Sequence, residues 1–288
     1  MSNTKNVRLG VCQVIYDGVD LGYTQGGVDV TVKTDTHQVN VDQFGKTPIN
    51  EYLLGRSVEA KTPLAETTLD NLVAVMPGAT MHVTGGTVAT GSITIAQKPA
   101  DGDTVTVNGF ALTFRTNPLS ATEVAIGTAV ADAATNLAST LNNVEIDNRL
   151  NAATYAANAG VVTVTYGSKE VYGASGSPSV DGNAFTLAAG QASVTVSGAT
   201  LTGGTNPSSR SVRVTTGIGT NLLDLARPLR LHPIDKPAND VSDDFVIPLA
   251  ATPGQLSFSY TTDKERLYDV TFNGYPDPNT RLLFTVGE

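Results

Sequence analysis

Valine alternates with polar residues between positions 28 and 33, and this spacing confines the segment to a half-buried β-strand. The alternating residues are Val28, Asp29, Val30, Thr31, Val32 and Lys33. Further along, the valines move from even to odd positions, at Val39 and Val41. A slip of one residue turns every following side chain to the opposite face of a sheet. We therefore predict a bulge or a break near residues 35–37.

Composition divides the chain into an outer and an inner part. Residues 92–205 hold 4 basic and 8 acidic residues among 114, whereas residues 1–91 and 206–288 together hold 14 basic and 19 acidic among 174. Glycine pairs at 85–86 and 203–204, the second followed by Asn206-Pro207, are typical of linkers. We predict a discontinuous domain, 1–91 with 206–288, that carries an inserted domain, 92–205.

Both domains are expected to be mainly β. In the inserted domain, Asn108-Gly109 predicts a hairpin turn between strands at 104–107 and 110–114. One amphipathic helix is expected at 128–141, followed by strands at 161–166 and 194–196, which together make a small α+β domain. In the outer domain, strands are expected at 8–16, 28–43, 57–62, 211–215, 255–262, 268–272 and 282–286. They surround one helix at 68–76, capped by Thr67 and Asp70, so the expected fold is a β-sandwich or barrel with one helix.

Catalytic signatures are missing from the sequence. The three histidines, His37, His82 and His232, have no metal-ligand spacing, and no nucleophile elbow, HExxH motif or Walker lysine occurs. We therefore expect no enzyme activity, no cofactor and no metal. The lone cysteine, Cys12, excludes an internal disulfide and is expected to be a small buried apolar residue.

Two acidic groups leave alternatives open. Asp101 and Asp103 are compatible with a calcium ion, but also with the ordinary start of a hairpin. Asp240, Asp243 and Asp244 are compatible with a solvated loop, with a bound ion or with a salt bridge between subunits.

Charge and hydropathy limit the possible partners. The net charge of −9 argues against DNA binding through clustered Lys and Arg, although like-charge repulsion suits a surface that stays near DNA without holding it. No apolar run approaches the length of a membrane span, and the N-terminus has no signal-peptide pattern. We expect a soluble protein with no membrane partner.

A long, partly apolar segment at 44–54 is expected to be a loop between two strands. It contains five large apolar residues, Phe44, Ile49, Tyr52, Leu53 and Leu54, and is longer than a hairpin turn requires. Such a loop either packs on its own domain or docks onto a neighbour, and docking is the favoured interpretation. The segments 23–27 and 229–237 are lesser candidates for the same role.

Three stretches in this order, LGYTQGGVDVTV, VDQFGKTPINEYLLG and VEAKTPLAETTLDNLVAVMPG, resemble the tail tube (major tail) proteins of long-tailed bacteriophages. The resemblance continues through LSFSYTTDKERLYDVTFNGYPDPNTRLLFTVGE and covers most of the outer domain. The GDTVTVNG hairpin of the inserted domain, with the helix after it, resembles modules of phage tail and virion proteins.

The resemblance implies a structural subunit of the virion tail, assembled in the bacterial host cytoplasm. Subunits would form hexameric rings, stacked into a hollow tube through which DNA passes during ejection without specific binding. The expected partners are other copies of the chain, the tape measure, the tail terminator and the distal tail or baseplate proteins. The segment 44–54 would reach the adjacent ring, and the inserted domain would project outside the tube.

The polar residues of the two predicted strands are the candidates for the lumen of such a tube. They are Asp29, Thr31, Lys33, Asp35, Asp42, Glu59 and Lys61. The alternative for these residues is the ordinary solvated face of a monomer. For the whole protein, one alternative is the inner-tube protein of a contractile injection or secretion device. Another, of a different class, is a glycan- or cell-surface-binding β-domain protein, although the chain has no Trp for a sugar platform.

Overall fold

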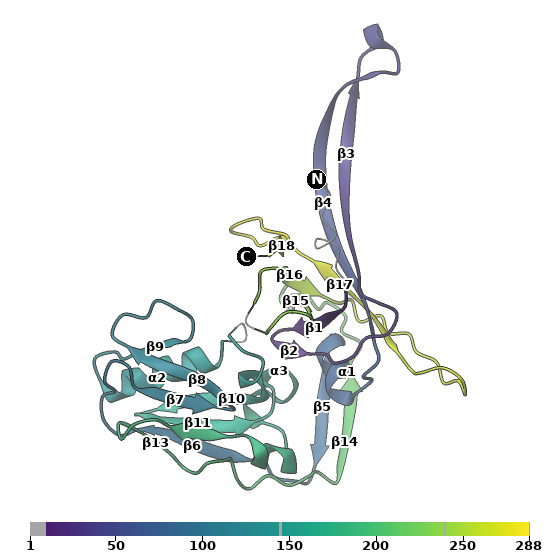
Figure 1. Cartoon of the computed structure of the whole chain (residues 1–288). Helices are drawn as coiled ribbons and strands as arrows, with labels where there is room; N and C mark the ends of the chain where they lie inside the picture. The colour runs from purple at the N-terminus through teal and green to yellow at the C-terminus, as the bar shows by residue number, and fades with distance from the viewer. Residues whose placement is uncertain (1–9, 144–145, 239, 288) are drawn as a thin grey trace. The chain divides into compact units, whose positions relative to one another are not determined.

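A computed structural model describes residues 10–143, 146–238 and 240–287 (Figure 1). Within this part of the chain, residues 10–16, 20–78 and 215–287 form one compact unit, unit 1, and residues 17–19 and 79–214 form a second, unit 2. The main segment of unit 2, 79–214, is longer at both ends than the predicted inserted domain, 92–205. The predicted mainly β fold is confirmed.

Unit 1 is built on an eight-stranded sheet with the order β2-β1-β15-β16-β17-β4-β3, in which β18 also pairs with β16. The strands are β1 (Cys12–Tyr16), β2 (Val19–Asp20), β3 (Asp29–Asn40), β4 (Pro48–Leu64), β15 (Arg227–Pro233), β16 (Phe245–Ala251), β17 (Tyr268–Gly274) and β18 (Thr285–Val286). Residues 8 and 9 of the predicted strand 8–16 lie outside the described residues. The predicted strand 255–262 does not form, and only an isolated bridge joins Ser257 to Asp269.

Helix α1 (Leu69–Val75) is the predicted helix of the outer domain, but its cap differs from the prediction. Thr68, not Thr67, is the N-cap, and its hydroxyl accepts a hydrogen bond from the Asn71 amide at 3.1 Å. The Asn71 side chain in turn donates to the carbonyls of Leu21 and Glu66, both at 2.8 Å. These bonds tie the start of the helix to the segments that flank it.

The core of unit 1 lies on one face of the sheet and includes buried residues from β1, β4, β15, β16 and β17. Tyr16 and Phe272 meet in it with ring centroids 4.9 Å apart, and the Tyr16 hydroxyl donates to the Ala250 carbonyl at 3.2 Å. Burying a Phe side chain of this kind contributes roughly 1.5–3 kcal/mol to folding. Cys12, at the start of β1, is half-buried, and burial raises the pKa of its thiol.

Unit 2 has its own larger core, between two four-stranded sheets and helix α2 (Val130–Leu141). One sheet has the order β10-β11-β6-β13 and the other β12-β7-β8-β9. Their strands are β6 (Thr90–Ile95), β7 (Thr104–Val107), β8 (Phe110–Arg115), β9 (Glu123–Ala125), β10 (Ala153–Asn158), β11 (Val161–Tyr166), β12 (Leu187–Ala189) and β13 (Val194–Val196). The hairpin at Asn108-Gly109, the helix and the strands 161–166 and 194–196 all form where they were predicted. The unit also contains α3 (Lys169–Tyr172).

Unit 2 also contains a separate antiparallel ribbon, β5 (Ala79–Thr84) with β14 (Ser209–Val214), which connects the part around this core to the rest of the chain. Past the end of the ribbon, Thr87 and Thr205 form hydrogen bonds with each other through both backbone and side-chain atoms. Ala89, two residues later, is already completely buried in the core of unit 2. The inserted structure therefore begins before residue 92.

Candidate assembly surface

The β3–β4 hairpin extends well beyond the rest of its sheet (Figure 1). Strand β17 pairs with β4 only at residues 58–64, whereas β3 pairs with β4 from Lys61 to Pro48. Residues 33–57, called the arm here, are therefore a two-stranded ribbon with a short turn. The prediction of a loop at 44–54 is wrong from residue 48 onward, because β4 begins at Pro48. An isolated two-stranded ribbon is marginal in water, so the arm is a segment that gains from packing on a neighbour.

A change of register occurs where the sequence predicts a bulge. Asp35 pairs with Gly55 and Thr36 pairs with Leu53, which leaves Leu54 as an extra residue. The extra residue lies in β4 and not in β3. A second shift, between Val39 and Asn40, leaves Ile49 as another extra residue of β4. Strand β3 therefore keeps its alternation from Asp29 to Asn40, and its valines change face because the sequence pattern itself changes.

The register places six of the seven candidate lumen residues on one face of the hairpin. Asp29 lies opposite Lys61, Thr31 opposite Glu59, Lys33 opposite Ser57, and Asp35 opposite Gly55. Residues directly opposite in an antiparallel pair share a face. This polar face consists of Asp29, Thr31, Lys33, Asp35, Glu59 and Lys61. The seventh candidate, Asp42, lies instead in the short helical turn η2 (Asp42–Phe44) at the tip.

The polar face mixes charges of both signs. Its three carboxylates and two ammonium groups are interleaved, with Asp29 and Lys61 at opposed positions. Strand β17 continues the face, since Thr271 pairs with Lys61 and Asn273 pairs with Glu59. The face therefore has no cluster of Lys or Arg suited to gripping phosphates.

The apolar side chains of the arm point in both directions. Phe44, Ile49, Tyr52, Leu53 and Leu54 are each more than half exposed. Leu53 lies opposite Thr36, on the face that also carries Val30 and Val32, whereas Tyr52 lies opposite His37, on the side of the polar face. Apolar surface on both sides of a thin ribbon is costly to leave in water and is typical of an interaction site.

Strand β3 is a terminal strand of the sheet, and its twelve residues form one continuous edge. The backbone groups along the outer side of such a strand are free to pair with another chain. The other end of the sheet is formed by β2, a strand of two residues.

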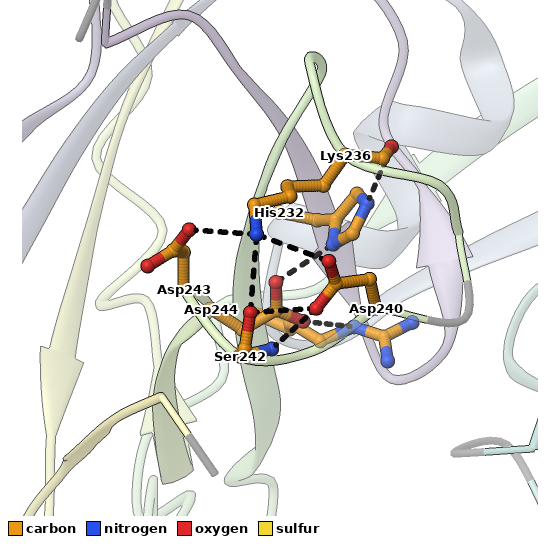
Figure 2. A network of polar contacts seen from close by, with 7 residues as sticks. His232, Lys236, Asp240, Ser242, Asp243 and Asp244 are labelled. Atoms are coloured by element: carbon orange, nitrogen blue, oxygen red, sulfur yellow. Dashed lines mark hydrogen bonds and ion pairs between the residues drawn. The ribbon is translucent and has the colours of Figure 1, made fainter. Parts of the chain in front are cut away.

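The second docking candidate, 229–237, is divided between a strand and a loop. Its first part belongs to β15, with Leu229 and Leu231 buried in the core. Its second part belongs to a polar network, shown in Figure 2, that sequence reasoning missed. In this network Lys236 Nζ contacts Asp240 Oδ2 at 3.0 Å, Asp243 Oδ2 at 3.1 Å and Ser242 Oγ at 3.2 Å.

The three neighbouring acidic residues have different roles in this network. Asp244 is buried, with Oδ1 2.7 Å from Nδ1 of His232 and Oδ2 3.7 Å from Nε of Arg230. Asp240 lies nearer the surface, where hydrogen bonds from Ser242 and Lys236 lower its pKa to about 2. The carboxylates of Asp240 and Asp243, which accept hydrogen bonds from Lys236, raise its pKa. Each acidic residue thus has a partner within its own chain.

The pair Asp101 and Asp103 also stabilises local structure. Asp101 accepts hydrogen bonds from the Thr116 amide at 2.7 Å and from Arg115 Nη1 at 3.1 Å, and these bonds lower its pKa. Asp103 accepts from the Ala100 amide and from the Ser193 hydroxyl. Throughout the described part of the chain, no group of three or more His, Cys, Asp or Glu is arranged to hold a metal ion.

Comparison of the sequence with models of known protein families and with curated proteins gives no match. None of the helices in the described residues is both long enough and apolar enough to span a membrane.

Proposed function

We propose that this protein is the tail tube subunit of a long-tailed bacteriophage, forming stacked rings that conduct DNA. The observation that carries the proposal is the arm, a ribbon with exposed apolar residues on both faces and no further strand beside it among the described residues. Its sequence is also the part of the chain in which the resemblance to tail tube proteins is strongest.

The edges of the sheet fit assembly into a ring. Strand β3 leaves one long edge open at the end of the sheet, and joining sheets from neighbouring subunits removes such edges. Cyclic symmetry closes the ring, and a second, heterologous contact between rings gives a polymer of open length. The partners in this proposal are other copies of the chain, the tape measure, the tail terminator and the distal tail or baseplate proteins.

The polar face fits a DNA conduit. A bore lined with clustered Lys and Arg would hold DNA by releasing counterions, whereas a lining of mixed charge allows the DNA to slide. Asp29, Glu59 and Lys61 would lie on this lining, and Leu53, on the opposite face of the hairpin, would pack on a neighbouring subunit.

Electron microscopy of the purified chain in negative stain tests the proposal. We expect rings or tubes for the wild type and a loss of both in Leu53→Asp, because a carboxylate cannot be buried without a partner. The matched control is Leu119→Asp, which changes an equally apolar, 94% exposed residue of unit 2 and should assemble normally. Wild-type protein that stays monomeric at high concentration, even with tail initiation proteins, would contradict the proposal.

A further inference from the structure

The chain contains one Asp-Pro sequence, Asp277-Pro278, in the turn between β17 and β18. Asp277 is half-buried and Pro278 is exposed, so water reaches the peptide bond that joins them. Such a bond can break from within, because the Asp side chain can attack its own backbone carbonyl carbon and the leaving nitrogen belongs to a tertiary amide. Its reactivity in a folded chain depends on how the structure holds the carboxylate and the carbonyl.

The carboxylate of Asp277 is held through one of its two oxygens. Oδ1 accepts hydrogen bonds from the Thr280 amide at 2.7 Å, from the Thr280 hydroxyl at 3.0 Å and from the Asn279 amide at 2.9 Å. Oδ2 takes part in none of these bonds. The bonds from Thr280 and Asn279 lower the pKa of Asp277. An ordinary Asp takes up its proton near pH 3.9, so Asp277 keeps an ionised, nucleophilic carboxylate in more acidic solution than an ordinary Asp does.

The carbonyl group of the same peptide bond is polarised by a backbone donor. The Arg281 amide donates a hydrogen bond to the Asp277 carbonyl oxygen at 2.8 Å. Arg281 makes this bond with a φ of 60°, a conformation that residues other than glycine seldom adopt. The Asp277 amide donates to the Leu282 carbonyl at 2.9 Å, which closes the turn from its other side. An N–H group fixed on a carbonyl oxygen stabilises the negative charge that develops there during an attack.

We propose that the turn 277–282 is a self-cleavage site, at which the chain cuts its own Asp277–Pro278 bond in mildly acidic solution. Oδ2 of Asp277 attacks the backbone carbonyl carbon of the same residue, a cyclic anhydride forms, and the bond from that carbon to the Pro278 nitrogen breaks. The nitrogen takes a proton from the solvent and leaves as a secondary amine. Water then opens the anhydride, so each cut consumes one water molecule and leaves Asp277 with a free α-carboxylate. The inference does not depend on the proposed function.

The segment that follows the cut has contacts of its own with unit 1. The ring of Phe284 stacks on that of Phe245 with centroids 5.2 Å apart, and β18 pairs with β16. The Gly287 amide donates to the Asp244 carbonyl at 2.8 Å. These contacts do not pass through the Asp277–Pro278 bond. We therefore expect the C-terminal fragment, which begins at Pro278, to stay in place after the cut.

A second Asp-Pro bond in the same chain measures what the turn contributes. Asn117→Asp creates this bond before Pro118, in an exposed loop of unit 2 where no described backbone hydrogen bond reaches the carbonyl of residue 117. The full-length variant is incubated at about pH 4, circular dichroism verifies its fold, and mass spectrometry measures the fragments over time. We expect cleavage after residue 277 to be at least about tenfold faster than after residue 117, because one oriented donor on the carbonyl oxygen has an effect of this order or larger. In concentrated urea the two rates should become equal.

Each outcome of this experiment bears on the proposal. Equal rates at the two bonds of the folded chain, or a slower rate after residue 277, would indicate an ordinary Asp-Pro bond only and would overturn it. Asp277→Ala, added to Asn117→Asp, should abolish the cut after residue 277 and leave the cut after residue 117 unchanged. A cut after residue 277 that persists in this variant would overturn the role of the side chain. Size-exclusion chromatography of the cut chain should show the C-terminal fragment with the rest of the protein until urea is added, and its early loss would overturn the predicted retention.

Discussion

The Nδ1 atom of His232 lies 2.7 Å from Oδ1 of Asp244, inside unit 1, where the two residues are 3% and 2% exposed. Asp244 stands opposite His232 where the β15–β16 pairing ends, and its backbone amide and carbonyl bond to Val241 and Gly287. The pair therefore joins the end of the sheet to the loop 234–243 and to the C-terminal strand.

Removal of the buried carboxylate should destabilise unit 1 strongly. In Asp244→Ala, His232 and Arg230 lose a buried partner, and breaking a buried pair from one side costs about 3–5 kcal/mol. Asp243→Ala is the matched control, because Asp243 meets Lys236 near the surface and such pairs contribute about 0–1 kcal/mol. Hydrogen exchange of the β15 and β16 amides measures both changes. Equal protection in the two variants would contradict the prediction.

Acid should loosen the loop 234–243 through Asp240. Hydrogen bonds from Ser242 and Lys236 lower the pKa of Asp240 from 3.8 to about 2 in the folded chain. A group whose pKa is lower in the folded state stabilises it fully above the unfolded pKa, and this contribution is lost as the pH falls from about 4 through 2. Asp240→Asn should lose this part of the pH dependence. Hydrogen exchange of the loop between pH 2 and 6 provides the measurement, and an unchanged profile in the variant would refute the assignment.

Unit 2 should be removable at its ribbon. Thr84 and Ser209 are directly opposite each other in the β5–β14 pair, so a two-residue Asn-Gly turn can replace residues 85–208. We expect the shortened chain to fold and to form rings or tubes. Deletion of 92–205 is expected to fold less well, because it leaves Ala89 and Thr90 without the core and strands that they join in unit 2. Circular dichroism and negative-stain microscopy compare the two deletions.

Reversing charges on the polar face should make tubes retain DNA. Asp29→Lys with Glu59→Lys places four lysines on this face, since Lys33 and Lys61 already lie there. DNA retention should then appear at low ionic strength and fall steeply as salt is added. A control with the same change of net charge, Asp181→Lys with Asp224→Lys, lies outside the face and should retain none. Filter binding of assembled tubes at several salt concentrations measures the DNA that each variant retains. Equal retention by the face variant and the control would contradict the prediction.

Local sequence patterns were sufficient for much of the fold. Alternation of valine with polar residues located β3, and the Asn108-Gly109 turn with its flanking strands located the β7–β8 hairpin. Apolar spacing located α2. These features depend on the period of one short segment, which is fixed by backbone geometry. The change of parity near residues 35–37 coincides with one of the two register shifts of the β3–β4 pair, but the extra residue there lies in β4, so the shift does not explain the parity change in β3.

Pairing across the chain decided what local patterns could not. Only the register of β4 against β3 showed that Leu54 and Ile49 are extra residues of β4 and that 48–54 is strand. The structure likewise placed Asp42 in the turn at the tip, apart from the polar face. The burial of Asp244 beside His232, while Asp240 and Asp243 hold Lys236, likewise depends on β15 lying next to β16. The sequence by itself therefore determined the elements with a regular short period, such as β3, the β7–β8 hairpin and α2, because backbone period is a local property. The tertiary structure decided which side chains share a face or a partner, because hydrogen-bond register and burial join residues that are distant in the chain.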